Sequence, residues 1–174
     1  IAFITGNGGS HDPASLHQTD SGLIRPQHWH HIVATWDGKN KRIYVDGRLA
    51  GEFPSVGVIR PGATALRLGA YGSDGVADHF YNGDLAMCVI YQRALNKDDI
   101  LKRFSDHGQT APKDESALGC WPFVEERGSR VADVSNDGRH GQIINKGTWM
   151  IGGPSFDAGA IGRHDTSYDP SKDP

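Results

Sequence analysis

The chain has 174 residues, a formal net charge of −3 and a sequence pI near 6.3. A chain of this length can bury a core as one domain, and its scattered Lys and Arg residues argue against a nucleic-acid partner. The 23 glycines and nine prolines are typical of an all-β domain with many turns, and no apolar run approaches the ~20 residues that cross a bilayer.

The two ends of the chain predict a piece of a longer protein. It begins with the apolar run Ile1-Ala2-Phe3-Ile4, without an initiator methionine or a visible signal peptide, which also favours a cytoplasmic location. The polar, Asp- and Pro-rich stretch 163–174 is typical of a linker to a downstream region. We therefore expect one β-sandwich over 1–162, which could lack its first strands, followed by a linker.

Residues 28–53 predict three antiparallel strands in a meander. Side chains alternate in character along 28–36, the pattern of a half-buried strand, and would place His28 and His30 on one face. Asp46-Gly47 lies between two apolar runs and predicts a tight hairpin turn, because both residues tolerate a positive φ.

Further strands are indicated along 65–72, 85–95 and 117–126, and shorter ones within 133–145 and 148–156. Pro122 favours the end or the edge of its strand, since it has no N–H to donate. Roughly eight short strands then predict an all-β, two-sheet antiparallel jelly-roll sandwich.

One short helix is expected over 97–104. Asn96 with Asp99 three residues later forms a capping-box pattern at its start, and Gly108 suits the C-terminal cap. Its apolar stripe consists of Ile100, Leu101 and Phe104.

The two cysteines, Cys88 and Cys120, both lie in apolar stretches that predict strands. We expect two reduced, buried thiols, because a free cysteine behaves as a small apolar residue. A single disulfide between them is the alternative.

Two segments resemble the laminin-G-like, concanavalin-A-like jelly-roll family. They are "WHHIVATWDGKNKRIYVDGRLAGE" at 29–52 and "FYNGDLAMCVIYQRALNKDDILKRF" at 80–104. The resemblance implies a two-sheet sandwich with one short helix. The later segment "ALGCWPFVEERGSRVADVSNDGRHGQIIN" is similar to the opening of such a domain, although here it comes last.

The final run "GTWMIGGPSFDAGAIGRHDTSYDPSKDP" at 147–174 resembles the large (β) subunits of the N,N-dimethylformamidase family, bacterial amidohydrolases that cleave a formamide to formate and an amine. That resemblance implies that this chain is a non-catalytic lectin-like part of such a subunit. Its partners would be other domains or subunits of the same enzyme, and the family's iron would lie outside this chain. A free-standing carbohydrate- or protein-binding module is the alternative function.

Four residues of the 28–36 segment are candidate ligand-binding residues: Trp29, Trp36, His28 and His30. An exposed tryptophan on a concave sheet can stack on a sugar ring. On one strand face His28 and His30 would lie ~7 Å apart, given the rise per residue of a strand. Two imidazoles alone are too few for a zinc or iron site, so a polar strand mouth is the simpler interpretation.

Asp74, Asp78 and Asp84 lie in a glycine-rich loop and are candidate Ca²⁺ ligands, because Ca²⁺ prefers oxygen ligands on flexible loops. The alternative is a solvated loop. No other cofactor and no catalytic residue is expected in this chain. A glycosidase needs two facing carboxylates, whereas the adjacent Glu125 and Glu126 would point to opposite faces of a strand.

Overall fold

Short strands and one helix make up the part of the chain that the structure, a computed structural model, describes: residues 1–6, 15–60, 65–72, 76–144 and 147–150. In chain order the elements are β1 (Ala2–Phe3), β2 (His17–Gln18), β3 (Ile32–Trp36), β4 (Asn40–Val45), β5 (Arg48–Pro54), β6 (Ala70–Tyr71), β7 (Asp78–Phe80), β8 (Cys88–Tyr91), α1 (Lys97–Ser105), β9 (Ala117–Trp121), β10 (Arg130–Val131) and β11 (Gly141–Gln142).

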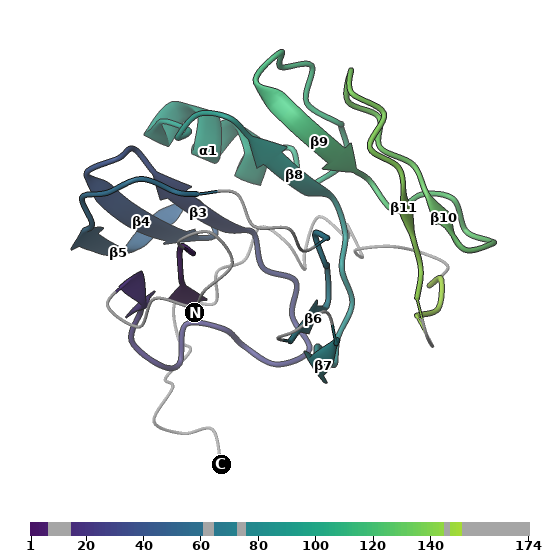
Figure 1. Cartoon of the computed structure of the whole chain (residues 1–174), viewed down its shortest axis with the longest axis horizontal. Coiled ribbons are helices and arrows are strands. Elements are labelled where there is room, and N and C mark those ends of the chain that lie inside the picture. Colours follow the sequence, from purple (N-terminus) through teal and green to yellow (C-terminus); the bar gives the residue numbers. More distant parts are fainter. Residues whose placement is uncertain (7–14, 61–64, 73–75, 145–146, 151–174) are drawn as a thin grey trace.

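All strand pairs in the described residues are antiparallel. β3, β4 and β5 form a three-stranded meander, and the other strands form the pairs β1–β2, β6–β7, β8–β9 and β10–β11 (Figure 1). The predicted fold class, an all-β antiparallel sandwich with one short helix, is confirmed. The expected linker at 163–174 lies outside the described residues.

The strand predicted over 28–36 is wrong in its first half, since β3 begins only at Ile32. Gln27 has a positive φ of 63°, and the N–H of Arg25 donates to Nε2 of His30 at 3.0 Å. These local contacts turn the chain back on itself before β3, so His28 and His30 do not share a sheet face. The strand predicted over 65–72 is likewise reduced to β6.

The hairpin turn at Asp46-Gly47 is confirmed, with positive φ angles of 49° and 75°. Gly47 is required for packing as well as for the turn. A Cβ at Gly47 would lie 3.1 Å from side-chain atoms of both Leu101 and Phe104 of α1. The absent side chain therefore lets the helix rest directly on the hairpin.

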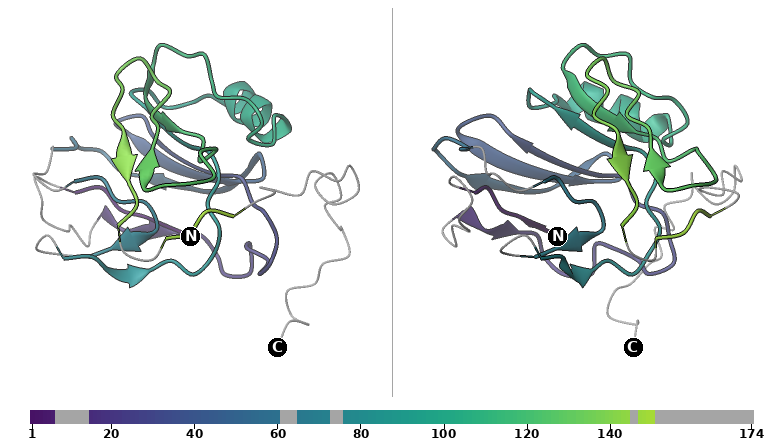
Figure 2. Two further views of the ribbon diagram at one scale, coloured as in Figure 1. Left: turned by 90° about the vertical axis from the view of Figure 1, so that its right-hand side faces the viewer. Right: turned by 45° about the vertical axis from the view of Figure 1, so that its right-hand side comes forward.

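Strand β4 is buried on both faces, as the middle layer of the views in Figures 1 and 2 shows. Lys41 and Ile43, on one face, are fully buried. Nζ of Lys41 donates to the carbonyl of Ser15 and lies 5.2 Å from the ring centroid of Phe3. The β1–β2 hairpin therefore covers this face of the sheet.

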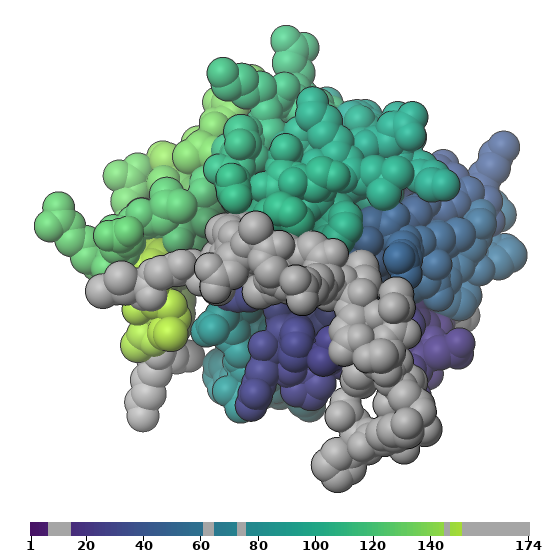
Figure 3. Space-filling view, turned by 180° about the vertical axis from the view of Figure 1, so that it is seen from behind, coloured from purple at the N-terminus to yellow at the C-terminus, as the bar shows by residue number. Residues whose placement is uncertain are grey.

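The helix α1 covers the other face of β4. Tyr44 forms a buried apolar cluster with Leu95 and Ile100, against which Val33 and Tyr91 pack. From behind, the teal surface of the helix region lies directly beside the blue surface of the β3–β5 sheet (Figure 3). Together the two covers make β4 the centre of the core.

The capping box that begins α1 is confirmed. Oδ1 of Asn96 accepts from the N–H of Asp99, and the Asp99 carboxylate accepts from the N–H of Asn96. The nine-residue helix ends at Ser105, one residue beyond the prediction. Within the described residues no helix is long and apolar enough to cross a membrane.

Strand register keeps the two cysteines apart as free thiols, as predicted. Cys88 lies opposite Trp121 and Cys120 lies opposite Val89, so the thiols point to different faces of the β8–β9 pair. Burial raises the pKa of both, that of Cys120 to about 11. Both thiols are therefore protonated and unreactive at neutral pH.

The buried carboxylate of Asp133 joins β9 to the turn before β11. It accepts hydrogen bonds from the backbone N–H groups of Cys120, Ser135 and Arg139 at 2.7–2.8 Å and from Oγ of Ser135 at 2.9 Å. Burial alone would raise its pKa, but these hydrogen bonds outweigh burial and hold the pKa at about 2.

We expect the stability of the chain to fall as the pH drops below about 6.5, where an unfolded histidine takes a proton. Burial lowers the pKa of His31, an effect that Asp46 opposes and Arg103 reinforces. Its Nδ1 is buried without a hydrogen-bond partner, and its ring stacks on Phe104 with centroids 6.1 Å apart. The unfolded state therefore binds more protons, and protonation favours unfolding.

Urea unfolding at pH 7.5 and 5.5 measures this effect. The loss of stability on acidification should be smaller in His31→Phe than in the unaltered chain. His28→Phe is the matched control, because His28 is exposed, and should keep the full loss. An equal loss in all three proteins would contradict the prediction.

Candidate ligand-binding groove

The side chain of His30 holds the hairpin turn and is not available as a ligand. Its Nδ1–H donates to Oδ2 of Asp46 at 2.8 Å, and its Nε2 accepts from the N–H of Arg25 at 3.0 Å. Oδ1 of Asp46 also accepts from the N–H of His31 at 2.8 Å. Because both ring nitrogens of His30 are used, the ring is the neutral Nδ1–H tautomer and has no lone pair left for a metal.

The structure does not bring the four candidate ligand-binding residues together. Nδ1 of His28 donates to the carbonyl of Pro26 at 2.9 Å, at an exposed position. Trp29 lies before β3 and is 41% exposed. Trp36, by contrast, lines a concavity.

That concavity is a groove of about 450 Å³ at the open end of the β1–β2 and β3–β5 layers, where the chain leaves β5. Its lining includes His17, Trp36, Val56, Val58 and Arg60. The volume lies within the range of ~300–1,000 Å³ typical of small-ligand sites. Aromatic and apolar side chains with a few polar groups are the usual composition of such a site.

Two contacts fix the aromatic rings of the groove. The indole N–H of Trp36 donates to the carbonyl of Ser55 at 2.8 Å, which orients the ring. His17 stacks on Phe53 with ring centroids 5.0 Å apart and an interplanar angle of 12°. The polar edge of Trp36 is thus satisfied by the protein itself, and its ring face is left for contact.

Sequence reasoning identified Trp36 but missed its neighbours in the groove. They come from three stretches distant in the sequence: the end of β1 with the start of β2, β3, and 54–60. The signal in the sequence was two valines, Val56 and Val58, within a stretch that also contains Pro54 and Gly57. The structure shows these valines 87% and 73% exposed.

The structure describes two of the three candidate Ca²⁺ ligands, Asp78 and Asp84. Oδ1 of Asp78 lies 2.6 Å from Nδ1 of His79, and the side chain of Asp84 is exposed. Asp74 lies outside the described residues. The described part of the chain contains no group of three His, Cys, Asp or Glu side chains placed to hold a metal.

Two of the glutamates, Glu52 and Glu125, make structural contacts. Oε1 of Glu125 accepts from the N–H of Ala132, and Oε1 of Glu52 pairs with Arg42 at 2.8 Å. Glu125 and Glu126 follow β9 in a loop and not in a strand, which corrects the predicted strand end.

The fold and the match to known families agree. The concanavalin A-like lectin/glucanases superfamily matches residues 1–101, more than half of the 174 residues. The chain therefore belongs to this superfamily, whose matched region contains β1 to β8 and the first half of α1.

No curated protein matches the chain. Among solved structures, an S-layer domain-containing protein (residues 221–444) from Clostridium thermocellum is similar, with 19% identity and a TM-score of 0.41. The match covers 59% of this chain and 49% of that structure, so the chain spans about half of its length.

A Ca²⁺ site in the loop that carries Asp78 would have an affinity of about 10⁻⁴–10⁻³ M, the range of extracellular modules. Calorimetry would then show binding heat in the unaltered chain and its loss in Asp78→Asn. Asp20→Asn, an exposed aspartate elsewhere in the chain, is the control and should leave the heat unchanged. Absence of heat at millimolar Ca²⁺ would refute the site.

Proposed function

We propose that this chain is a non-catalytic, lectin-like binding module and that the groove at Trp36 receives a carbohydrate. The observation that carries this proposal is the groove itself, in which a fixed indole and a stacked imidazole lie beside polar side chains. Sugar rings have apolar faces that stack on aromatic rings and hydroxyl edges that need donors and acceptors. The groove offers both kinds of contact.

The polar part of the groove supports the same ligand class. Thr5 and Ser15 lie on its wall, where Oγ of Ser15 donates to the carbonyl of Thr5 at 2.6 Å. Arg60 adds a cationic donor at the rim. Hydrogen-bonding groups around an aromatic ring give orientation to a ligand that stacking alone would hold without direction.

The two tryptophans at the ends of the 29–36 segment provide a matched test on a glycan array. Trp36→Phe removes part of the stacking area and the indole N–H in the groove, and we expect about tenfold weaker glycan binding, consistent with the size of aromatic stacking contributions. Trp29→Phe changes a similar side chain outside the groove and should bind like the unaltered chain.

Thermal unfolding of both variants separates a folding defect from a binding defect. The proposal requires that Trp36→Phe remain folded and lose binding. Equal glycan binding by the two variants, or the absence of any bound glycan in the unaltered chain, would remove the groove as the carbohydrate site.

A second candidate function is that of a lectin-like domain within an amidohydrolase subunit of the N,N-dimethylformamidase type. It is supported by the resemblance of the segment 147–174 and by exposed apolar side chains in the C-terminal part of the described chain. Val134, Ile144 and Met150 are each more than half exposed. Exposed apolar side chains are available for contact with another domain.

The intact mass of the native polypeptide in its source cells tests this second function. We expect a mass several times 18.9 kDa, together with formamide hydrolysis by the whole assembly. In such an assembly the described residues of this chain would supply no catalytic group, so Glu125→Gln should leave the turnover unchanged. A native mass of 18.9 kDa would contradict this role and leave the binding module.

A further inference from the structure

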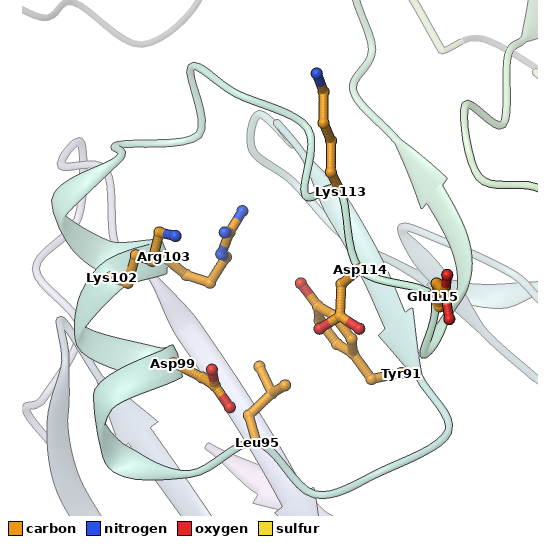
Figure 4. A pocket seen from close by; sticks show the side chains of 8 residues that line it. All are labelled: Tyr91, Leu95, Asp99, Lys102, Arg103, Lys113, Asp114 and Glu115. Atoms are coloured by element: carbon orange, nitrogen blue, oxygen red, sulfur yellow. The ribbon is translucent and has the colours of Figure 1, made fainter.

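A second concavity, separate from the groove at Trp36, lies between α1 and the segment that leads into β9. Its volume is about 380 Å³, and Tyr91 and Leu95 line it together with charged side chains from both walls (Figure 4). The charged residues are Asp99, Lys102, Arg103, Lys113, Asp114 and Glu115. Nothing in the concanavalin A-like fold of the chain requires so many charges around one concavity.

Arg93 joins the two walls and fixes the shape of the concavity. Its guanidinium binds Asp99 of α1 at 2.7 Å and Asp114 of the facing segment at 2.9 Å. Asp114 also accepts from the N–H and Oγ of Ser116 at 2.9 and 2.7 Å. This network fixes the spacing of the two walls before any ligand binds. Binding then costs less conformational entropy, because the side chains of the walls are already ordered.

The same network stabilises the negative charges of Asp99 and Asp114. The hydrogen bond from Arg93 lowers the pKa of Asp99, and the hydrogen bonds from Ser116 lower that of Asp114. Both stay ionised and retain lone pairs that can accept from hydroxyl groups. Neither has a free charge that would call for a bound cation.

Arg103 is the cation that faces into the concavity. Its side chain extends from α1 into the concavity, and Tyr91 and Asp114 lie across from it (Figure 4). Within the described residues, the ion pair that Arg103 forms with Asp106 is 3.6 Å long, beyond an ordinary hydrogen bond. The fork of donors is thus free to meet a carboxylate with two parallel hydrogen bonds.

The phenol of Tyr91 forms the floor. Burial is the main cause that raises its pKa, so the hydroxyl is protonated at neutral pH and can donate. Lys102 and Lys113 add positive charge near the rim. The concavity thus combines carboxylate-binding donors with acceptors for several hydroxyl groups.

We propose that this concavity binds a sugar acid, a monosaccharide unit that carries a carboxylate, with Arg103 on the carboxylate and the ionised aspartates on the ring hydroxyls. A single acidic side chain of a partner would use Arg103 but would leave the hydroxyl acceptors unused. The concavity volume, near the lower limit for small-ligand sites of ~300 Å³, suits one sugar ring. The proposal is independent of the groove at Trp36.

The test uses glucuronate and galacturonate as probes, titrated into the ¹⁵N-labelled 174-residue chain and followed by amide shifts of α1 and 113–116. We expect both uronates to bind, and glucose and acetate each to bind at least about tenfold more weakly, since each lacks one half of the recognition. Arg103→Gln should weaken uronate binding by about tenfold or more, because it removes the charge-assisted pair.

Three controls keep the result interpretable. Lys97→Gln removes a positive charge from the same helix outside the concavity and should leave the affinity unchanged. Arg103→Lys keeps the charge and loses the fork, so its affinity should fall between those of the unaltered chain and Arg103→Gln. Thermal unfolding confirms that each variant folds.

Three results would overturn the proposal. They are no amide shift with tens of millimolar uronate, an equal response to acetate and uronate, and equal uronate affinity of Arg103→Gln and the unaltered chain. None of them bears on glycan binding at Trp36, so failure here and failure of the proposed function are distinguishable.

Discussion

The carboxylate of Asp46 is the contact on which the sheet and the helix both depend. One of its oxygens accepts from the His30 ring and the other from the backbone of His31, while its own backbone forms the turn between β4 and β5. The chain entering β3 is thereby fixed against a turn whose second residue, Gly47, leaves room for α1. Within the histidines at 28–31, the ring of His30 and the backbone N–H of His31 serve this junction. An imidazole with both nitrogens bonded inside the protein is a structural group.

Features encoded by neighbouring residues could be predicted from the sequence. The Asp46-Gly47 turn needs only its own positive φ angles, and the start of α1 needs only Asn96 and Asp99. The position of His30 could not be predicted, because its partner lies 16 residues further along the chain. Periodicity therefore indicated a strand where a side-chain hydrogen bond makes the chain turn. The groove is a still harder case, since Trp36 has a role there only once the β1–β2 hairpin and the loop after β5 have been brought beside it.

The concavities of this chain arise where the layers end. The groove at Trp36 opens at the limit of β3 and β5, and the charged concavity opens where β8 passes into α1 and where the chain returns to β9. In both places backbone pairing stops, so side chains and not strand ladders determine the shape. Membership of the concanavalin A-like lectin/glucanases superfamily therefore predicts the layers of the chain but does not identify its ligand. Residues that line these concavities can be substituted without altering the buried contacts of β4.

The register of β8 against β9 has a consequence for the conditions under which the chain folds. With Cys88 and Cys120 on different faces of one strand pair, no covalent bond can close between them without a shift of that pairing. Backbone pairing holds β8 to β9. Trp121 ties β9 in turn to the residues before β11, because its indole N–H donates to the carbonyl of Arg139 at 2.9 Å. The domain therefore takes no stability from an oxidising environment and loses none in a reducing one.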